Sequence, residues 1–197
     1  MARPAEFDRD EVLERAMDLF WKTGYTATSV TDLVKVTNLK PGSLYGAFNN
    51  KRDLFLACIE VYTQRSLALI SDIFEQAETP LKGIESFFDF LCHDLEADEI
   101  GKSCLLVNTI LELSSEDEEI RSIGAQYLDE IEKLFLTELT KAQQLGEIDK
   151  EMDISDITTY LMSSIWGLRV LSCKRPDKSK YRAVIQNTLR VLYTSIH

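Results

Sequence analysis

The segment 28–51 carries hydroxyl and amino groups whose types and spacing suit contact with a DNA duplex. Ser43 and the hydroxyl of Tyr45 can donate hydrogen bonds to phosphate oxygens. Lys51 adds a positive charge that phosphates attract. The chemistry that these residues favour is therefore noncovalent binding of DNA.

Two glycines shape the surface beside these groups. Gly42 and Gly46 share the face of a predicted helix that lies opposite Leu44 and Phe48, so nothing bulky projects from it. Each glycine costs the helix about 1 kcal/mol relative to alanine, which favours a role in close approach to another polymer. Glycine has no side-chain donor or acceptor, so direct reading of bases is sparse and DNA shape is expected to contribute. The residues left to contact bases are Lys40, Thr31, Pro41 and Ala47.

Two short helices joined by a tight turn must position these groups. Thr28 and Ser29 are candidate N-caps of the first helix, with Asp32 three residues after Ser29. Asn38 suits the turn because asparagine tolerates the left-handed backbone conformation. A further helix is predicted within residues 8–24. Three helices before residue 49 are typical of a helix-turn-helix unit that reads duplex DNA.

The run GYTATSV at 24–30, followed by PGSLY at 41–45, Phe48 and Lys51, resembles the TetR/AcrR family of bacterial regulators. The resemblance implies an all-α fold, with a three-helix DNA-binding domain at the N-terminus and a C-terminal helical domain for effector binding and dimerisation. By motif position it also implies a set of DNA contacts. These are Thr28, Ser29, Thr31, Lys40, Gly42, Ser43, Tyr45, Gly46 and Lys51.

The net charge of −11 is distributed unevenly along the chain. Residues 1–58 contain eight Lys+Arg and eight Asp+Glu, whereas residues 59–197 contain 14 and 25. A neutral N-terminal unit attracts phosphate weakly, so we expect affinity to depend on a homodimer that places two units on a palindromic operator. No run of 18 consecutive apolar residues occurs and the first ten residues lack an apolar signal region, so we expect a cytoplasmic protein without a membrane partner.

The expected domains are residues 1–53 and 54–197, and a helix from Leu54 to Phe74 connects them. The last two predicted helices carry apolar stripes. Such stripes can close their own monomer, but the resemblance implies that they form a four-helix interface between two protomers, where Gly167 would permit close approach. The expected interface residues are Ile157, Leu161, Ile165, Leu168, Tyr181, Val184, Ile185, Leu189, Leu192 and Ile196.

A small-molecule effector is expected in the C-terminal domain, because aromatic side chains with one or two polar groups suit such a ligand. For each candidate residue, the interpretation as an ordinary core residue stays open. The effector itself does not follow from the sequence. The candidate lining residues are Phe87, Phe88, Phe90, Leu91, Leu106, Tyr127, Trp166 and Arg169.

One of the four cysteines lies in a distinctive setting. Cys104 falls at the start of a predicted helix, where the helix dipole and Lys102 would favour the thiolate. The run GKSCLLVN at 101–108 resembles the start of the sixth helix in a TetR subgroup, some members of which sense oxidants or electrophiles through this cysteine. The alternative is a small packing residue. The spacing of the cysteines includes no CxxC pair, and we expect no metal and no cofactor.

Taken together, these patterns predict a homodimeric transcriptional repressor that a small-molecule effector releases from its operator. One alternative keeps the DNA binding but makes the chain a thiol-based sensor that acts through Cys104. A second alternative is an all-α enzyme or carrier. The second is disfavoured because two histidines, without paired carboxylates or a nucleophile motif, offer no catalytic constellation.

Overall fold

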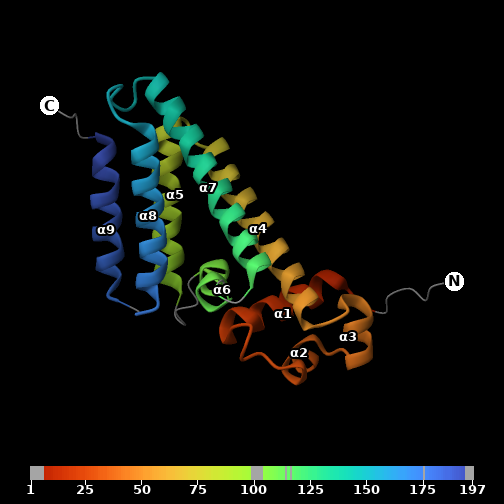
Figure 1. Ribbon diagram of the computed structural model, residues 1–197. Helices are drawn as coiled ribbons and strands as arrows, with labels where there is room; N and C mark the ends of the chain where they lie inside the picture. The colour runs from red at the N-terminus through yellow and green to blue at the C-terminus, as the bar shows by residue number, and fades with distance from the viewer. Residues whose placement is uncertain (1–6, 99–103, 114, 116, 175, 194–197) are drawn as a thin grey trace.

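The computed structural model describes residues 7–98, 104–113, 115, 117–174 and 176–193. Within these residues the chain forms helices and no strand, which confirms the predicted all-α fold (Figure 1). The elements are α1 (Arg9–Thr23), α2 (Val30–Thr37), α3 (Pro41–Phe48), α4 (Lys51–Glu75), α5 (Pro80–Ala97), α6 (Leu105–Leu113), α7 (Glu118–Gln144), α8 (Ile154–Ser172), α9 (Lys178–Arg190) and the short 3₁₀ helix η1 (Val191–Tyr193).

Local side-chain caps fix the first three helices where the sequence places them. The Asp8 carboxylate accepts hydrogen bonds from two backbone N–H groups at the start of α1. Ser29 and Asp32 form a reciprocal capping box at the start of α2. Asn38 ends α2 in the left-handed conformation, with φ 57°. Pro41 then occupies the first turn of α3, where its missing N–H costs nothing.

The connecting helix α4 joins the N-terminal unit to the rest of the molecule (Figure 1). Its first half packs against α1, where the Cys58 thiol donates to the Leu13 carbonyl oxygen at 3.6 Å. The helix also packs against α5 and α7, where Phe74 near its end contacts Phe87 and Phe135. The predicted domain boundary after residue 53 therefore falls inside a continuous helix. Among the described helices, α4 is also the one whose length and composition would suffice to cross a membrane, a property that core helices of soluble proteins share.

Aromatic rings form the centre of the C-terminal bundle. Phe74 of α4, Phe87 and Phe88 of α5, and Phe135 of α7 pack against one another with ring centroids 4.9 to 6.5 Å apart, edge to face in every pair except the tilted Phe74–Phe87. Such contacts add about 0.5–1.5 kcal/mol per pair beyond the burial of area. The four rings hold α4, α5 and α7 together.

The predicted dimerisation stripes of α8 and α9 lie largely inside the monomer, which corrects the sequence-based expectation. Leu161, Ile165, Leu168, Tyr181, Ile185 and Leu192 are buried in the core of the single chain, Ile157 and Leu189 are half-buried, and Ile196 lies outside the described residues. Val184 alone of the predicted set is exposed. Periodicity identifies an apolar face but not the partner that covers it, and α5 and α7 are that partner here.

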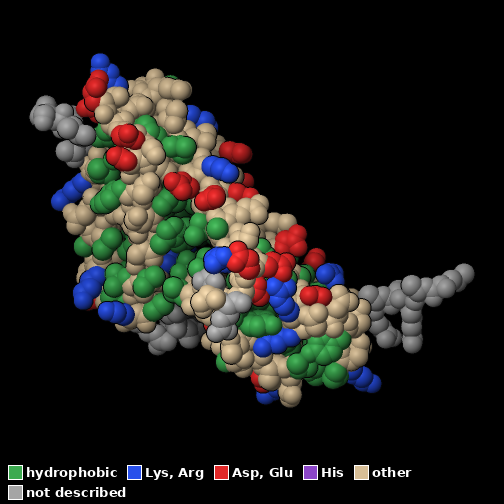
Figure 2. Space-filling view, in the orientation of Figure 1, with side chains coloured by type: hydrophobic (Ala, Val, Ile, Leu, Met, Phe, Trp, Pro, Cys, Tyr) green, Lys and Arg blue, Asp and Glu red, His purple; other side chains and the backbone are tan. Residues whose placement is uncertain are grey.

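A different apolar surface remains on the outside of this helix pair. Tyr160 and Val170 of α8 are 44% and 50% exposed, and Val184 of α9 is 37% exposed. A Cβ atom added to Gly167, between Tyr160 and Val170 in α8, would meet nothing within 4 Å. Figure 2 shows apolar side chains at the surface over α8 and α9. We call Tyr160, Gly167, Val170 and Val184 the outer face.

Candidate nucleic-acid interface

The exposed side of α3 is open and flat. Leu44 and Phe48 are buried against the N-terminal core, whereas Gly42, Ser43 and Gly46 are exposed. A Cβ atom added to either glycine would meet nothing within 4 Å. No steric requirement of the monomer therefore explains the two glycines, and the predicted separation of a buried face from a smooth outer face is confirmed.

Polar groups surround this smooth face. Lys40 occupies the N-cap position of α3 and is exposed, without a side-chain hydrogen bond to the cap. Tyr45 is half-buried, and Thr31 of α2 is exposed. Arg9 of α1 stabilises α3, since its guanidinium donates a hydrogen bond to the Ala47 carbonyl oxygen at 3.3 Å. The structure thus places the Lys40 side chain and the hydroxyl groups of Thr31 and Tyr45 beside the smooth face formed by Gly42 and Gly46.

Thr28 has a structural role instead of the predicted contact with DNA. Its side chain is 2% exposed. Its hydroxyl donates to the Gly24 carbonyl oxygen at 2.6 Å and lies 2.6 Å from the Thr23 hydroxyl. A hydroxyl that is buried and bonded within the loop has no access to phosphate, so Thr28 fixes the α1–α2 loop.

Ser29 is committed to the cap of α2. Its hydroxyl donates to the Asp32 carboxylate at 2.5 Å and accepts from the Asp32 N–H at 3.1 Å. The hydrogen bonds from Ser29 lower the pKa of Asp32. Since Ser29 remains exposed, the cap fixes the position of its hydroxyl at the edge of the surface.

Lys51 begins α4 and lies against an aromatic ring. Its ammonium is 4.2 Å from the centroid of Tyr25, a cation–π geometry. Partial burial lowers the pKa of Lys51, although the charge of Glu112 opposes this effect. The structure therefore holds Lys51 at the junction of the α1–α2 loop and α4, half-buried instead of extended into solvent.

Glu112, a residue that sequence reasoning missed, links the C-terminal domain to this loop. From α6 its carboxylate accepts hydrogen bonds from the backbone N–H groups of Tyr25 at 3.0 Å and Thr26 at 2.7 Å. Burial by itself would raise the pKa of Glu112, but these hydrogen bonds and the charge of Lys51 outweigh it and lower the pKa. Gly24 is required here, because its φ is +79° and an added Cβ would lie 2.9 Å from the carboxylate.

A second polar link joins the start of α4 to the start of α7. Arg52 donates to both carboxylate oxygens of Asp117 at 3.0 and 3.1 Å and pairs with Glu119 at 2.7 Å. Asp117 is at the same time the N-cap of α7. We call Arg52, Asp117 and Glu119 the junction cluster. Arg52 is separated from the two carboxylates by 65 residues or more along the chain, so no local pattern could reveal the cluster.

The residues predicted to line an effector pocket lie in different environments. Phe87, Phe88, Leu91 and Leu106 are core residues, and Phe90 is 37% exposed on the outside of α5, which contradicts its predicted role. Arg169 pairs with Asp94 at 2.5 Å, and Trp166 is half-buried. Tyr127 lines a groove between α4 and α7.

Cys104 is buried instead of exposed at the start of α6. Its carbonyl oxygen accepts from Asn108 at 3.0 Å, as expected of a residue that precedes the helix. Its thiol lies 3.2 Å from the Tyr62 hydroxyl and is 3% exposed. Burial raises the pKa of Tyr62, and the neighbouring thiol adds to this effect. Lys102, which we expected to activate the thiol, lies outside the described residues.

No cluster of His, Cys, Asp and Glu suited to a metal ion occurs among the residues that the structure describes. The other cysteines are Cys58 and Cys92, both buried, and Cys173, which is exposed. Burial raises the pKa of Cys58 to about 12, so this thiol stays protonated at neutral pH.

Comparison with known proteins matches both parts of the chain. Residues 12–58 match the family described as bacterial regulatory proteins, tetR family. Residues 80–187 match the family described as Tetracyclin repressor-like, C-terminal domain. The chain is 28% identical over 190 residues to the HTH-type transcriptional repressor ComR of Escherichia coli (strain K12), which covers 96% of this chain and 90% of ComR. It is 29% identical over 193 residues to the HTH-type transcriptional regulator YezE of Bacillus subtilis (strain 168), which covers 98% of this chain and all of YezE.

A solved structure of a relative includes DNA. A cysteine mutant of the TetR family transcriptional regulator CifR, complexed with 26-base-pair double-strand operator DNA, is similar to the chain with a TM-score of 0.86. The two are 27% identical, and the match covers 97% of this chain and 100% of that chain. With the open face of α3, this likeness supports DNA as the partner. The chain belongs to the TetR family and is a DNA-binding transcriptional regulator.

Proposed function

We propose that the protein is a homodimeric repressor that leaves a palindromic operator when a small-molecule effector binds its C-terminal domain. The observation that carries this proposal is the smooth face of α3, where two glycines cost helix stability without any steric need in the monomer. Relatives support the direction of regulation, since ComR is named a transcriptional repressor. In this proposal the protein acts in the cytoplasm and has no catalytic role.

The proposed DNA contacts lie on α2, α3 and the start of α4. Residues with an exposed or half-exposed hydroxyl, amine or backbone are retained from the sequence-based set, and Thr28 is left out because its hydroxyl is buried. Phosphate contacts position the unit, and Lys40 with Thr31 supplies the base contacts. The retained residues are Ser29, Thr31, Lys40, Gly42, Ser43, Tyr45, Gly46 and Lys51.

The proposed dimer forms through the outer face of α8 and α9. Three partly exposed apolar side chains and a glycine that leaves room for a facing helix suit a four-helix contact between two copies. A two-fold arrangement places the two N-terminal units on half-sites separated by about one helical turn of DNA, or a multiple of it. Neutral N-terminal units gain affinity from this pairing, because both halves of the operator are then bound together.

We propose that effector binding releases the protein from DNA by moving α4 and the two polar links, which are the Glu112 contact and the junction cluster. The Glu112 contact fixes the α1–α2 loop relative to α6, and the junction cluster fixes the start of α4 relative to α7. An effector that shifts α6 or α7 therefore changes the orientation of the N-terminal unit and with it the separation of the two units. A coupling free energy of about 1–3 kcal/mol is sufficient to change operator occupancy.

Selection of bound duplexes from a random library, at near-physiological salt, tests the proposal directly. Enrichment of a palindrome by the wild-type protein is the expected result, with Lys40→Ala as the variant that should broaden the selected sequence. A matched variant, Lys133→Ala on the exposed side of α7, removes the same charge far from α3 and should select the same palindrome. Recovery of no motif by the folded wild-type dimer would contradict operator binding.

A further inference from the structure

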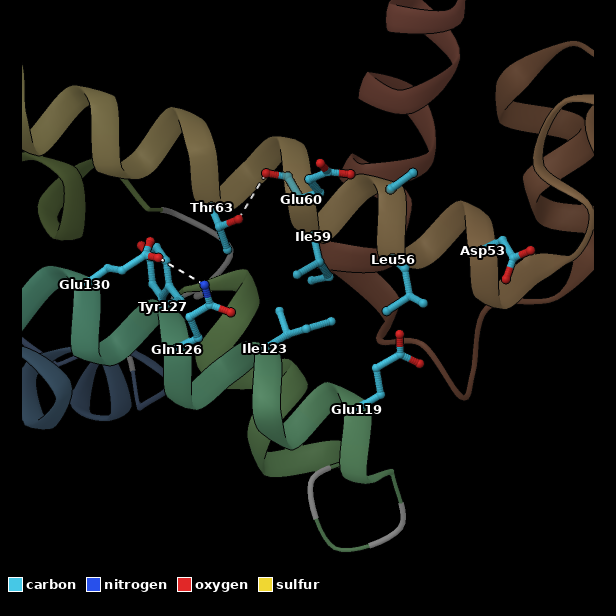
Figure 3. Close-up of a pocket in the computed structure, with 11 residues that line it drawn as sticks. Asp53, Leu56, Ile59, Glu60, Thr63, Glu119, Ile123, Gln126, Tyr127 and Glu130 are labelled. Atoms are coloured by element: carbon cyan, nitrogen blue, oxygen red, sulfur yellow. Dashed lines mark hydrogen bonds between the residues drawn. The ribbon is translucent and has the colours of Figure 1, made fainter.

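A groove of about 480 Å³ lies between α4 and α7, close to the N-terminal unit (Figure 3). Its volume falls within the range of small-molecule sites. Leu56 and Ile59 of α4 and Ile123 of α7 point toward one another across the space, and Tyr127 lies toward the far end. The groove therefore has an apolar interior that water does not solvate well.

Acidic side chains surround this apolar interior. The lining includes Asp53 and Glu60 from α4 and Glu119 and Glu130 from α7, and it includes no lysine, arginine or histidine. Asp53 and Glu119 lie at the end nearest the N-terminal helices, and Glu130 lies at the opposite end (Figure 3). Negative charge thus extends along the whole groove.

Three of these carboxylates accept hydrogen bonds from neutral side-chain amides in the described part of the chain, and Asp53 does so from Asn49 at 3.0 Å. The Glu130 carboxylate accepts from the side-chain amide of Gln126 at 3.2 Å, and the Glu60 carboxylate accepts from that of Gln64 at 3.4 Å. Glu119 by contrast pairs with Arg52. A cation that entered the groove would meet carboxylates whose charge an amide hydrogen bond does not neutralise.

We propose that this groove binds an organic cation with an apolar body, such as a quaternary ammonium or phosphonium compound. The apolar body would displace water from Leu56, Ile59 and Ile123, while the positive charge would lie within reach of Glu60 and Glu130. Tyr127 offers an aromatic ring, which attracts cations in addition. An anion of the same size and shape would meet the same apolar surface but the repulsion of four carboxylates.

The position of Glu119 connects this site to DNA binding. Glu119 lines the groove and is also the partner of Arg52 in the junction cluster. A bound cation adds positive charge to the groove that Glu119 lines, which weakens the attraction between Glu119 and Arg52 and so the link between α7 and the start of α4. This part of the proposal rests on the proposed function, because it identifies the chemical class of the effector.

The test uses tetraphenylphosphonium and tetraphenylborate, which share size and shape but carry opposite charges. Calorimetric titration of the full-length protein should detect the cation and not the anion. In E60Q/E130Q the affinity for the cation should fall about tenfold or more, as expected for the loss of two charges from a partly desolvated site. The matched control is E75Q/D129N, which removes one exposed charge from each of the same helices outside the groove and should bind as the wild type does.

Operator affinity is measured in parallel, with and without each probe. The expected result is that the cation weakens operator binding by the wild type and by E75Q/D129N about tenfold, and that E60Q/E130Q resists this effect. Equal binding of both probes, or equal binding of the cation by E60Q/E130Q, would overturn the groove assignment. Binding of the cation without any change in operator affinity would overturn its role as effector. Failure of the protein without probe to bind any operator would contradict the proposed function alone, since binding at the groove is scored separately.

Discussion

At the scale of single residues, the two glycines of α3 lower the stability of the helix and leave its outer surface open to close approach by DNA. Both lie on an exposed face where an added side chain would meet no protein atom. A larger residue there should stabilise the free protein and obstruct the complex. Stability and function are therefore expected to change in opposite directions.

Gly42→Leu is the variant that separates these effects. We expect the free energy of unfolding to rise by about 0.5–1 kcal/mol, because leucine favours the helix more than glycine does. Operator affinity should fall at least about tenfold, equivalent to about 1.4 kcal/mol, because the side chain blocks close approach. Thermal unfolding and fluorescence anisotropy measure the two quantities. Ala125→Leu, on an exposed part of α7, is the control that should leave operator affinity unchanged, and an unaffected affinity in Gly42→Leu would remove α3 from the interface.

Cys104→Ser distinguishes a packing residue from a redox sensor. Because the thiol is buried beside Tyr62, we expect the variant to lose about 1 kcal/mol of stability and to keep both operator binding and any response of the wild type to hydrogen peroxide. Operator binding is measured before and after the oxidant is added. A response that disappears in Cys104→Ser alone would favour the thiol-sensing alternative.

At the scale of elements, the sequence predicts helix limits well because the signals are local. The capping box of Ser29 with Asp32, the left-handed Asn38 and the turn after α2 each depend on residues within a few positions. Which neighbour covers the apolar face of a helix depends on residues far away in the sequence. For that reason the predictions for the faces of α8 and α9 differ from the structure. The family resemblance implies that Leu161 and Ile185 lie at a dimer interface, but their side chains are buried inside the monomer. Glu112 went unnoticed for the same reason, since its partners are 86 and 87 residues away.

Glu112→Gln tests the link between α6 and the α1–α2 loop. We expect a loss of about 1 kcal/mol in the free energy of unfolding at neutral pH, because the amide oxygen is a weaker acceptor than the carboxylate. Folding lowers the pKa of Glu112, so its stabilising effect is complete above the usual value near 4.5 and is lost as the pH falls through the folded-state pKa. The difference between wild type and variant should therefore shrink upon acidification. Denaturant titrations between neutral pH and acid measure it, and a difference independent of pH would contradict the role of the charge.

A double-mutant cycle on Arg52 and Asp117 tests the junction cluster. Both side chains are partly exposed, so we expect a coupling of only about 0.5–1 kcal/mol between Arg52→Ala and Asp117→Asn. Asparagine retains an oxygen for the N-cap of α7, which separates the ion pair from the cap. Denaturant unfolding of the four proteins gives the coupling. A value of zero would show that the ion pair does not hold α4 to α7.

At the scale of the whole molecule, the excess of acidic residues belongs to the part of the chain that follows the proposed DNA-binding unit. The net charge of −11 belongs to residues 59–197, while the first 58 residues are neutral. Glu112, Asp117 and Glu119 lie beside the N-terminal unit, but each is engaged there by backbone N–H groups or by Arg52. In the proposed dimer, two units on one duplex supply the affinity that one neutral unit lacks, so dimerisation would decide whether the operator is occupied.

Substitution of glutamate at Val170 and Val184 tests the outer face. A carboxylate buried at an interface costs about 1–3 kcal/mol, so the double variant should sediment as a monomer at concentrations where the wild type is a dimer. Operator affinity should fall in the same variant. Leu145→Glu is the control, since Leu145 is also apolar and exposed but lies at the end of α7. A double variant that remains dimeric would place the interface elsewhere.

The length of α4 determines how far a small rotation at one end of the helix displaces its other end. A continuous helix of 25 residues is about 37 Å long at 1.5 Å per residue. A rotation of about 5° around its far end displaces the near end by about 3 Å, close to the 3.4 Å separation of stacked base pairs. In the proposed mechanism, an effector therefore needs to rotate α4 by only a few degrees. In this proposal the length of α4, more than the strength of any single contact, sets how strongly DNA binding responds to an effector.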